Sequence, residues 1–145
     1  MNGRDFLLVA KDLLTSSTEA AWRSSVSRVY YAAFHVARQL LEDVGFTVPR
    51  GERAHAYLWL RLSNCGQPQV QDAGRRLNTL RGQRNRADYD VTAAFSRPTA
   101  DGQVRIGEAI IQVLDAAILE PTRTQITDAM RIYERDVLHD VSWHP

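Results

Sequence analysis

The stretch EAAWRSSVSRVYYAAFHVARQLLEDV, residues 19–44, carries the strongest structural signal in this chain. A second apolar row, formed by Tyr30, Phe34 and Leu41, adjoins the main apolar stripe of the stretch. A helix that is apolar on two faces packs at the centre of its domain, and at ~1.5 Å per residue this one would span ~40 Å. The main stripe has the three- and four-residue steps of an α-helix, and its members are Trp22, Val26, Val29, Ala33, Ala37, Leu40 and Val44.

Helical spacing recurs on both sides of this stretch, and no segment alternates apolar and polar residues as a strand would. Residues 90–102 are predicted to form a polar loop, because they contain Pro98 and end at Gly102. The last residues, LHDVSWHP, form a tail that is expected to be mobile. Besides the long helix, the spacing predicts helices over residues 5–14, 52–64, 69–89, 104–120 and 124–138.

These elements predict an all-α fold, an antiparallel up-and-down bundle of four to five core helices plus a C-terminal helix. A length of 145 residues fits one domain, residues 1–145. Its bundle core is expected over about residues 5–120 and its C-terminal helix over about 123–138.

Composition excludes several classes of protein. The formal net charge is +1. The single cysteine, Cys65, permits no internal disulfide, so an intracellular, cytoplasmic protein is expected. No apolar run approaches the 18 residues of a membrane helix, so no association with a membrane is expected. The P-loop, dinucleotide-binding and serine-hydrolase motifs are missing. One cysteine and four scattered histidines predict no metal site, and no cofactor is expected.

One arginine does not fit the helical pattern of residues 69–89. Arg84 continues a stripe formed by Val70, Ala73, Leu77, Leu80 and Ala87, where a permanently charged group needs either a partner or a cleft. Asp88 lies four residues further on and can pair with it. Two interpretations stay open: a structural ion pair between Arg84 and Asp88, or an anion-binding cleft in which Arg84 meets a phosphate.

Two motifs, one after the other along the chain, resemble those of the HEPN superfamily, and in particular of its short prokaryotic branch. They are SRVYYAAFHVARQLL, residues 27–41, and LRGQRNRADYD, residues 80–90. The resemblance implies a helical bundle that dimerises. It also implies, for many members, metal-independent endoribonuclease activity from an arginine, a following polar residue and a histidine a few residues later. A frequent partner in that branch is a nucleotidyltransferase, with the pair acting as a toxin–antitoxin module.

This chain departs from the family motif at the histidine. Arg84 and Asn85 match its first half, whereas Tyr89, Asp90 and Val91 stand where the histidine would be. A tyrosine has an ordinary pKa near 10, about three units too high for an efficient base at neutral pH. Whether the protein is an enzyme is therefore open.

Three functions remain under consideration. The first is a dimeric module that binds RNA or a nucleotide without cleaving it. The second is an active metal-independent endoribonuclease in which Tyr89, Asp88 or His35 replaces the histidine. The third is a structural adaptor that binds a nucleotidyltransferase partner. The predicted catalytic residues are Arg84, Asp88 and Tyr89, and the predicted substrate-binding residues are Arg81, Arg84, Asn85, Tyr31 and His35.

Overall fold

The predicted central helix is α2, Glu19–Asp43, and it is the longest element of the computed structural model, which describes residues 1–145. The Thr18 side chain accepts a hydrogen bond from the backbone N–H of Ala21 and so caps its first turn. The chain contains no strand. The other helices are α1 Asp5–Leu14, α3 Arg53–Leu62, α4 Pro68–Tyr89, α5 Arg97–Ala117 and α6 Thr122–Tyr133, and a short π-helix, Glu134–Leu138, follows α6.

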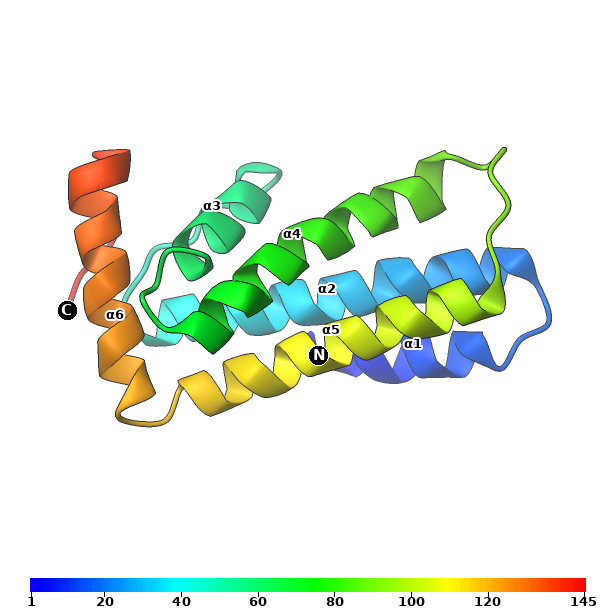
Figure 1. Ribbon diagram of the computed structural model, residues 1–145, viewed down its shortest axis with the longest axis horizontal. Coiled ribbons are helices and arrows are strands. Elements are labelled where there is room, and N and C mark those ends of the chain that lie inside the picture. Colours follow the sequence, from blue (N-terminus) through cyan, green and yellow to red (C-terminus); the bar gives the residue numbers. More distant parts are fainter.

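Four helices lie along the long axis of the molecule and alternate in direction: α1, α2, α4 and α5 (Figure 1). The shorter α3 packs against α4 and α2, and α6 stands across one end of the bundle (Figure 1). This arrangement confirms the predicted all-α bundle with an additional C-terminal helix. No helix combines the length and the apolar composition that a membrane crossing requires.

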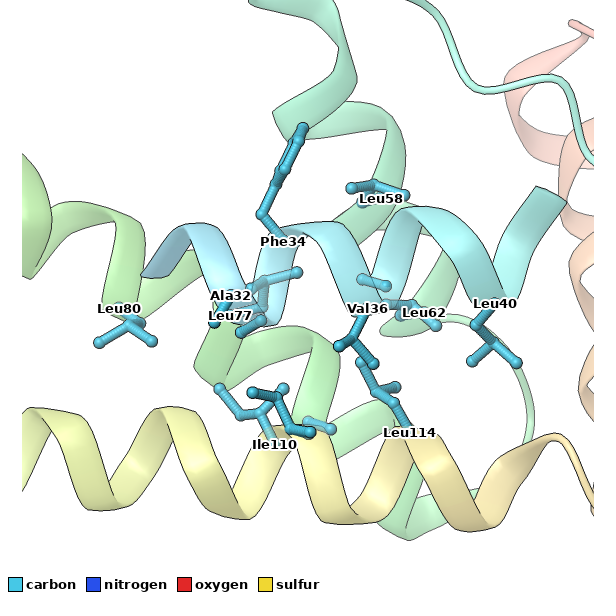
Figure 2. Packing of buried hydrophobic residues seen from close by; sticks show 14 of the residues in the cluster. Ala32, Phe34, Val36, Leu40, Leu58, Leu62, Leu77, Leu80, Ile110 and Leu114 are labelled. Atoms are coloured by element: carbon cyan, nitrogen blue, oxygen red, sulfur yellow. The ribbon is translucent and has the colours of Figure 1, made fainter. Parts of the chain in front are cut away.

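The core runs along α2 and includes side chains from all six helices. Figure 2 shows Leu77 of α4 and Ile110 of α5 meeting the α2 side chains, while Phe34 points toward α3. Helices α2 and α5 approach closely at Gly107, where an added Cβ would lie only 2.3 Å from Cγ2 of Val29. The residues predicted on the stripes of α2 and α4 are buried, apart from the half-buried Trp22.

Helix α5 begins at Arg97, seven residues before the predicted start, so the prediction of a loop up to Gly102 is wrong. The Ser96 side chain accepts a hydrogen bond from the Thr99 backbone N–H at 3.3 Å. Pro98 lies in the first turn, where a helix needs no N–H donor. The proline that indicated a loop therefore starts the helix.

Arg23 of α2 fixes the end of α4 and the loop that follows. Its guanidinium donates to the backbone carbonyl groups of Ala87 and Asp90, both at 3.0 Å, and also to that of Ala93. The Arg23 guanidinium also forms an ion pair with Glu19 at 3.0 Å. Because the last carbonyl groups of a helix lack partners within the helix, Arg23 satisfies them and holds the segment that carries Arg84.

The prediction of a mobile C-terminal tail is also wrong. Indole Nε1 of Trp143 donates to the Val44 carbonyl at 2.8 Å, and the His144 backbone N–H donates to the Gly45 carbonyl at 3.0 Å. The tail therefore folds back on the end of α2, and its hydrogen bonds hold it there.

Candidate functional site

Arg84 lies on the buried face of α4, as its place in the apolar stripe predicts, and only 8% of its side chain is exposed. Its guanidinium carbon lies 5.2 Å from the ring centre of Tyr31 and 5.7 Å from that of Tyr30, both on α2. Nη2 donates to the Tyr31 hydroxyl at 2.9 Å. Two aromatic faces and one phenol thus hold the charge without neutralising it.

The ion pair between Arg84 and Asp88 is loose. Nη1 of Arg84 lies 3.9 Å from Oδ2 of Asp88, which is too long for a hydrogen bond. The same carboxylate oxygen accepts a hydrogen bond from Oγ of Ser27 at 3.3 Å, and the Asp88 side chain is partly exposed. Asp88 therefore offsets the charge of Arg84 only in part.

Two guanidinium nitrogens of this region are buried without a partner. Among all side-chain nitrogen and oxygen atoms of the chain, only Nε of Arg81 and Nε of Arg84 are buried and accept or donate no hydrogen bond. The two arginines are one helical turn apart on the same face of α4. An unpartnered buried donor costs about 1–3 kcal/mol, so both nitrogens occur where an additional acceptor would be stabilising.

Arg81 forms an ion pair with the residue that precedes α3. Its Nη2 forms an ion pair with Oε2 of Glu52, the residue before α3, at 3.0 Å. Residues 75–86 contain five arginines, which lie on two faces of α4. Arg81 and Arg84 point inward, whereas Arg75, Arg76 and Arg86 are exposed.

His55 of α3 also belongs to this site, although no motif in the sequence pointed to it. Its Nδ1 is hydrogen-bonded to the Tyr30 hydroxyl, and the two rings stack with centres 5.6 Å apart. Burial lowers the pKa of the His55 imidazole, and the charge of Arg81 lowers it further. Burial likewise raises the pKa of the Tyr30 phenol. Both groups are therefore uncharged at neutral pH. We call Tyr30, Tyr31, His55, Arg81, Arg84 and Asp88 the Arg84 site.

The remaining predicted residues lie at its edge or away from it. Asn85 and Tyr89 are exposed on α4, Tyr89 with 76% of its surface accessible, and neither side chain makes a hydrogen bond within the chain. His35 stacks on Phe6 of α1 with ring centres 5.8 Å apart. No hydrogen bond joins His35 to Arg84. The structure thus brings together Arg81, Arg84, Asp88 and Tyr31 and leaves the other three outside.

A separate cavity lies elsewhere in the molecule. It measures about 620 Å³, and His35 lines it together with N-terminal residues and the C-terminal ends of α2 and α5. Its two arginines are already paired, Arg4 with Asp115 at 2.7 Å and Arg38 with Glu42 at 3.0 Å. Both arginines of this cavity therefore already have carboxylate partners. No three His, Cys, Asp or Glu side chains gather closely enough to hold a metal ion.

Acid is expected to destabilise the protein below about pH 6.5. The pKa values of His55 and His35 are both lowered in the folded state, chiefly by burial. The unfolded chain, with histidine pKa values near 6.5, therefore binds more protons in this range, and stability falls as the pH falls. The urea midpoint should drop between pH 7.5 and pH 5.5, and His55→Gln should drop less steeply. A midpoint that stays level or rises would contradict this expectation.

A comparison with protein families adds the identity of the fold. The family model described as HEPN domain matches residues 2–117, which include α1 to α5 and every member of the Arg84 site. No curated protein sequence and no solved structure matches the chain. The family match covers well over half of the residues, and the chain belongs to the HEPN domain family.

Proposed function

We propose that this protein binds RNA through its phosphates at the Arg84 site, without cleaving it. The observation that carries the proposal is the pair of buried, unpartnered Nε atoms of Arg81 and Arg84. An anion at this site would supply acceptors to two guanidinium groups that the chain satisfies only in part. Arginine suits a phosphate because its planar fork can donate two parallel hydrogen bonds. Tyr31, half-buried beside Arg84, offers a ring on which a base can stack.

The proposal includes a homodimer. Tyr89 and Val91 follow the Arg84 segment and leave 76% and 72% of their surfaces exposed, as expected of side chains that meet a partner. Two copies that meet there would place two Arg84 sites on one RNA. Family membership also supports a prokaryotic toxin–antitoxin or defence role with a nucleotidyltransferase partner. Mass measurement in solution tests the dimer, and copurification with the neighbouring gene product tests the partner.

Direct titration tests RNA binding. Fluorescently labelled single-stranded RNA is mixed with the protein in EDTA at several salt concentrations, and anisotropy gives the affinity. Each neutralised phosphate of a single strand contributes about −0.7 to the slope of log K against log salt. The two arginines of one site predict a slope of about −1.4, and those of a dimer about −2.8. Absence of binding at low salt would overturn the proposal and favour a structural adaptor. Competition by a mononucleotide would show whether a nucleotide suffices.

His55 favours a second candidate, the metal-independent endoribonuclease. An uncharged imidazole can accept a proton, and Tyr30 fixes the ring close to the arginine pair. The family motif places a histidine beside the arginine along one helix, and here α3 supplies an imidazole to the same region. End-labelled RNA in EDTA distinguishes the candidates. Cleavage that leaves 2′,3′-cyclic phosphate ends and is lost in His55→Ala, but kept in Tyr89→Phe, would establish the ribonuclease.

A further inference from the structure

Glu52 holds the Arg81 guanidinium from the solvent side. Its Oε2 lies 3.0 Å from Nη2 of Arg81, and this is the only polar contact of the Glu52 side chain. The residue directly precedes α3 but makes no capping hydrogen bond to that helix. With 83% of its side chain exposed, Glu52 can leave Arg81 by rotating about its own bonds. No movement of the backbone is needed.

The contact is not needed to hold α3 against α4. The two helices pack directly at Gly74, where an added Cβ would lie 2.8 Å from Cβ of Leu62. Leu58 and Leu62 of α3 are also fully buried. An exposed ion pair adds little to stability. The packing of α3 on α4 therefore does not depend on the ion pair between Glu52 and Arg81.

A carboxylate on a guanidinium occupies the position that a phosphate would take. Both groups present two oxygens to the same donor fork. Arg81 has no other anionic partner, and its Nε remains unpartnered even with Glu52 in place. The Glu52 carboxylate therefore satisfies only one nitrogen of the group, and an incoming phosphate competes with it for Nη2.

We propose that Glu52 is a built-in competitor that occupies the phosphate position on Arg81 and leaves when RNA binds. This inference rests on the proposed function of the Arg84 site. It adds a selection step, because only a ligand with enough phosphate charge to displace a carboxylate gains Arg81 as well as Arg84. A polyanion such as RNA then has an advantage over a single small anion.

Removing the competing charge tests the inference. Glu52→Gln should tighten binding of labelled single-stranded RNA about fivefold, the upper range for release of an exposed ion pair. The matched control is Glu42→Gln, which removes the same charge from a glutamate paired with Arg38 on α2 at 3.0 Å. It should change affinity less than twofold. In an Arg81→Ala background, Glu52→Gln should have no effect beyond that of the control.

The outcomes distinguish a failure of this inference from a failure of the proposed RNA binding. If the wild type binds RNA, Arg84→Ala binds it more weakly, and Glu52→Gln matches Glu42→Gln, the RNA site stands and the competitor role is wrong. Weaker binding by Glu52→Gln would mean that Glu52 positions Arg81 rather than competing for it, and would also overturn the inference. If neither the wild type nor Glu52→Gln binds RNA, the proposed function fails and the inference fails with it. Melting temperatures confirm that each variant is folded.

Discussion

Glu134→Ala is expected to lower the free energy of unfolding by about 3–5 kcal/mol, the cost of breaking a buried ion pair by removing one partner. Glu134 is fully buried, and its Oε2 lies 2.8 Å from Nε of Arg61, whose side chain is 3% exposed. The loss of Glu134 leaves the Arg61 charge in the interior without a counter-ion. A guanidinium in a protein stays charged, so the substitution leaves a buried charge behind.

The same carboxylate also anchors the tail, which adds to the expected loss. Its Oε1 accepts hydrogen bonds from the backbone N–H groups of Ser142 and Trp143 at 3.0 and 3.2 Å, and its Oε2 accepts one from the Ser142 hydroxyl. The substitution therefore removes both the ion pair and the acceptors that hold the tail against the bundle.

Urea denaturation followed by circular dichroism measures the effect. Asp136→Ala is the matched control, because Asp136 belongs to an exposed pair with Arg135, and it should change stability by no more than about 0.5 kcal/mol. The double substitution Arg61→Met with Glu134→Leu should recover the part of the loss that comes from the unpaired Arg61 charge, since apolar groups can replace a buried pair, but not the part that comes from the tail. A loss below about 1 kcal/mol for Glu134→Ala would show that the pair is solvated.

Periodicity predicted the buried faces of α2 and α4 because helical spacing is a local property of the chain. It also predicted that Arg84 is buried, since Arg84 takes a core position of the α4 stripe. Arg61 takes such a position in α3 among Ala54, Leu58 and Leu62. Its partner, however, is 73 residues away in sequence, and spacing along one helix does not identify a partner on another.

The same limit explains what was missed in the site. His55 and Glu52 reach the arginines from α3 and the residue before it, and only the packing of α3 on α4 brings them there. The four-residue spacing indicates that Asp88 can pair with Arg84, but it does not show that Ser27 donates a hydrogen bond to the same carboxylate. Local spacing therefore gave the residues of one helix, while their charge balance depends on neighbours from other helices.

Arg84→Ala is expected to weaken RNA binding by about 10- to 100-fold. A hydrogen bond to a charged group contributes about 1.5–3 kcal/mol, and Arg84 has donors free for a phosphate because Asp88 is 3.9 Å away. Anisotropy with labelled single-stranded RNA measures the loss. Arg84→Lys should also bind weakly, since a lysine keeps the charge but cannot bind Tyr31 and a phosphate through one planar fork.

Arg86→Ala is the matched control for this prediction. Arg86 lies two residues further along α4, is exposed, and its side chain forms no ion pair or hydrogen bond within the chain. Its removal changes the net charge by the same amount and should weaken binding less than threefold, the share due to general attraction of the phosphates. Equal losses in the two variants would mean that RNA is held by the overall charge of α4. A loss confined to Arg84→Ala, in a variant whose circular dichroism shows a folded bundle, would place the phosphate at the buried arginine, because of the two only Arg84 has a buried donor without a partner.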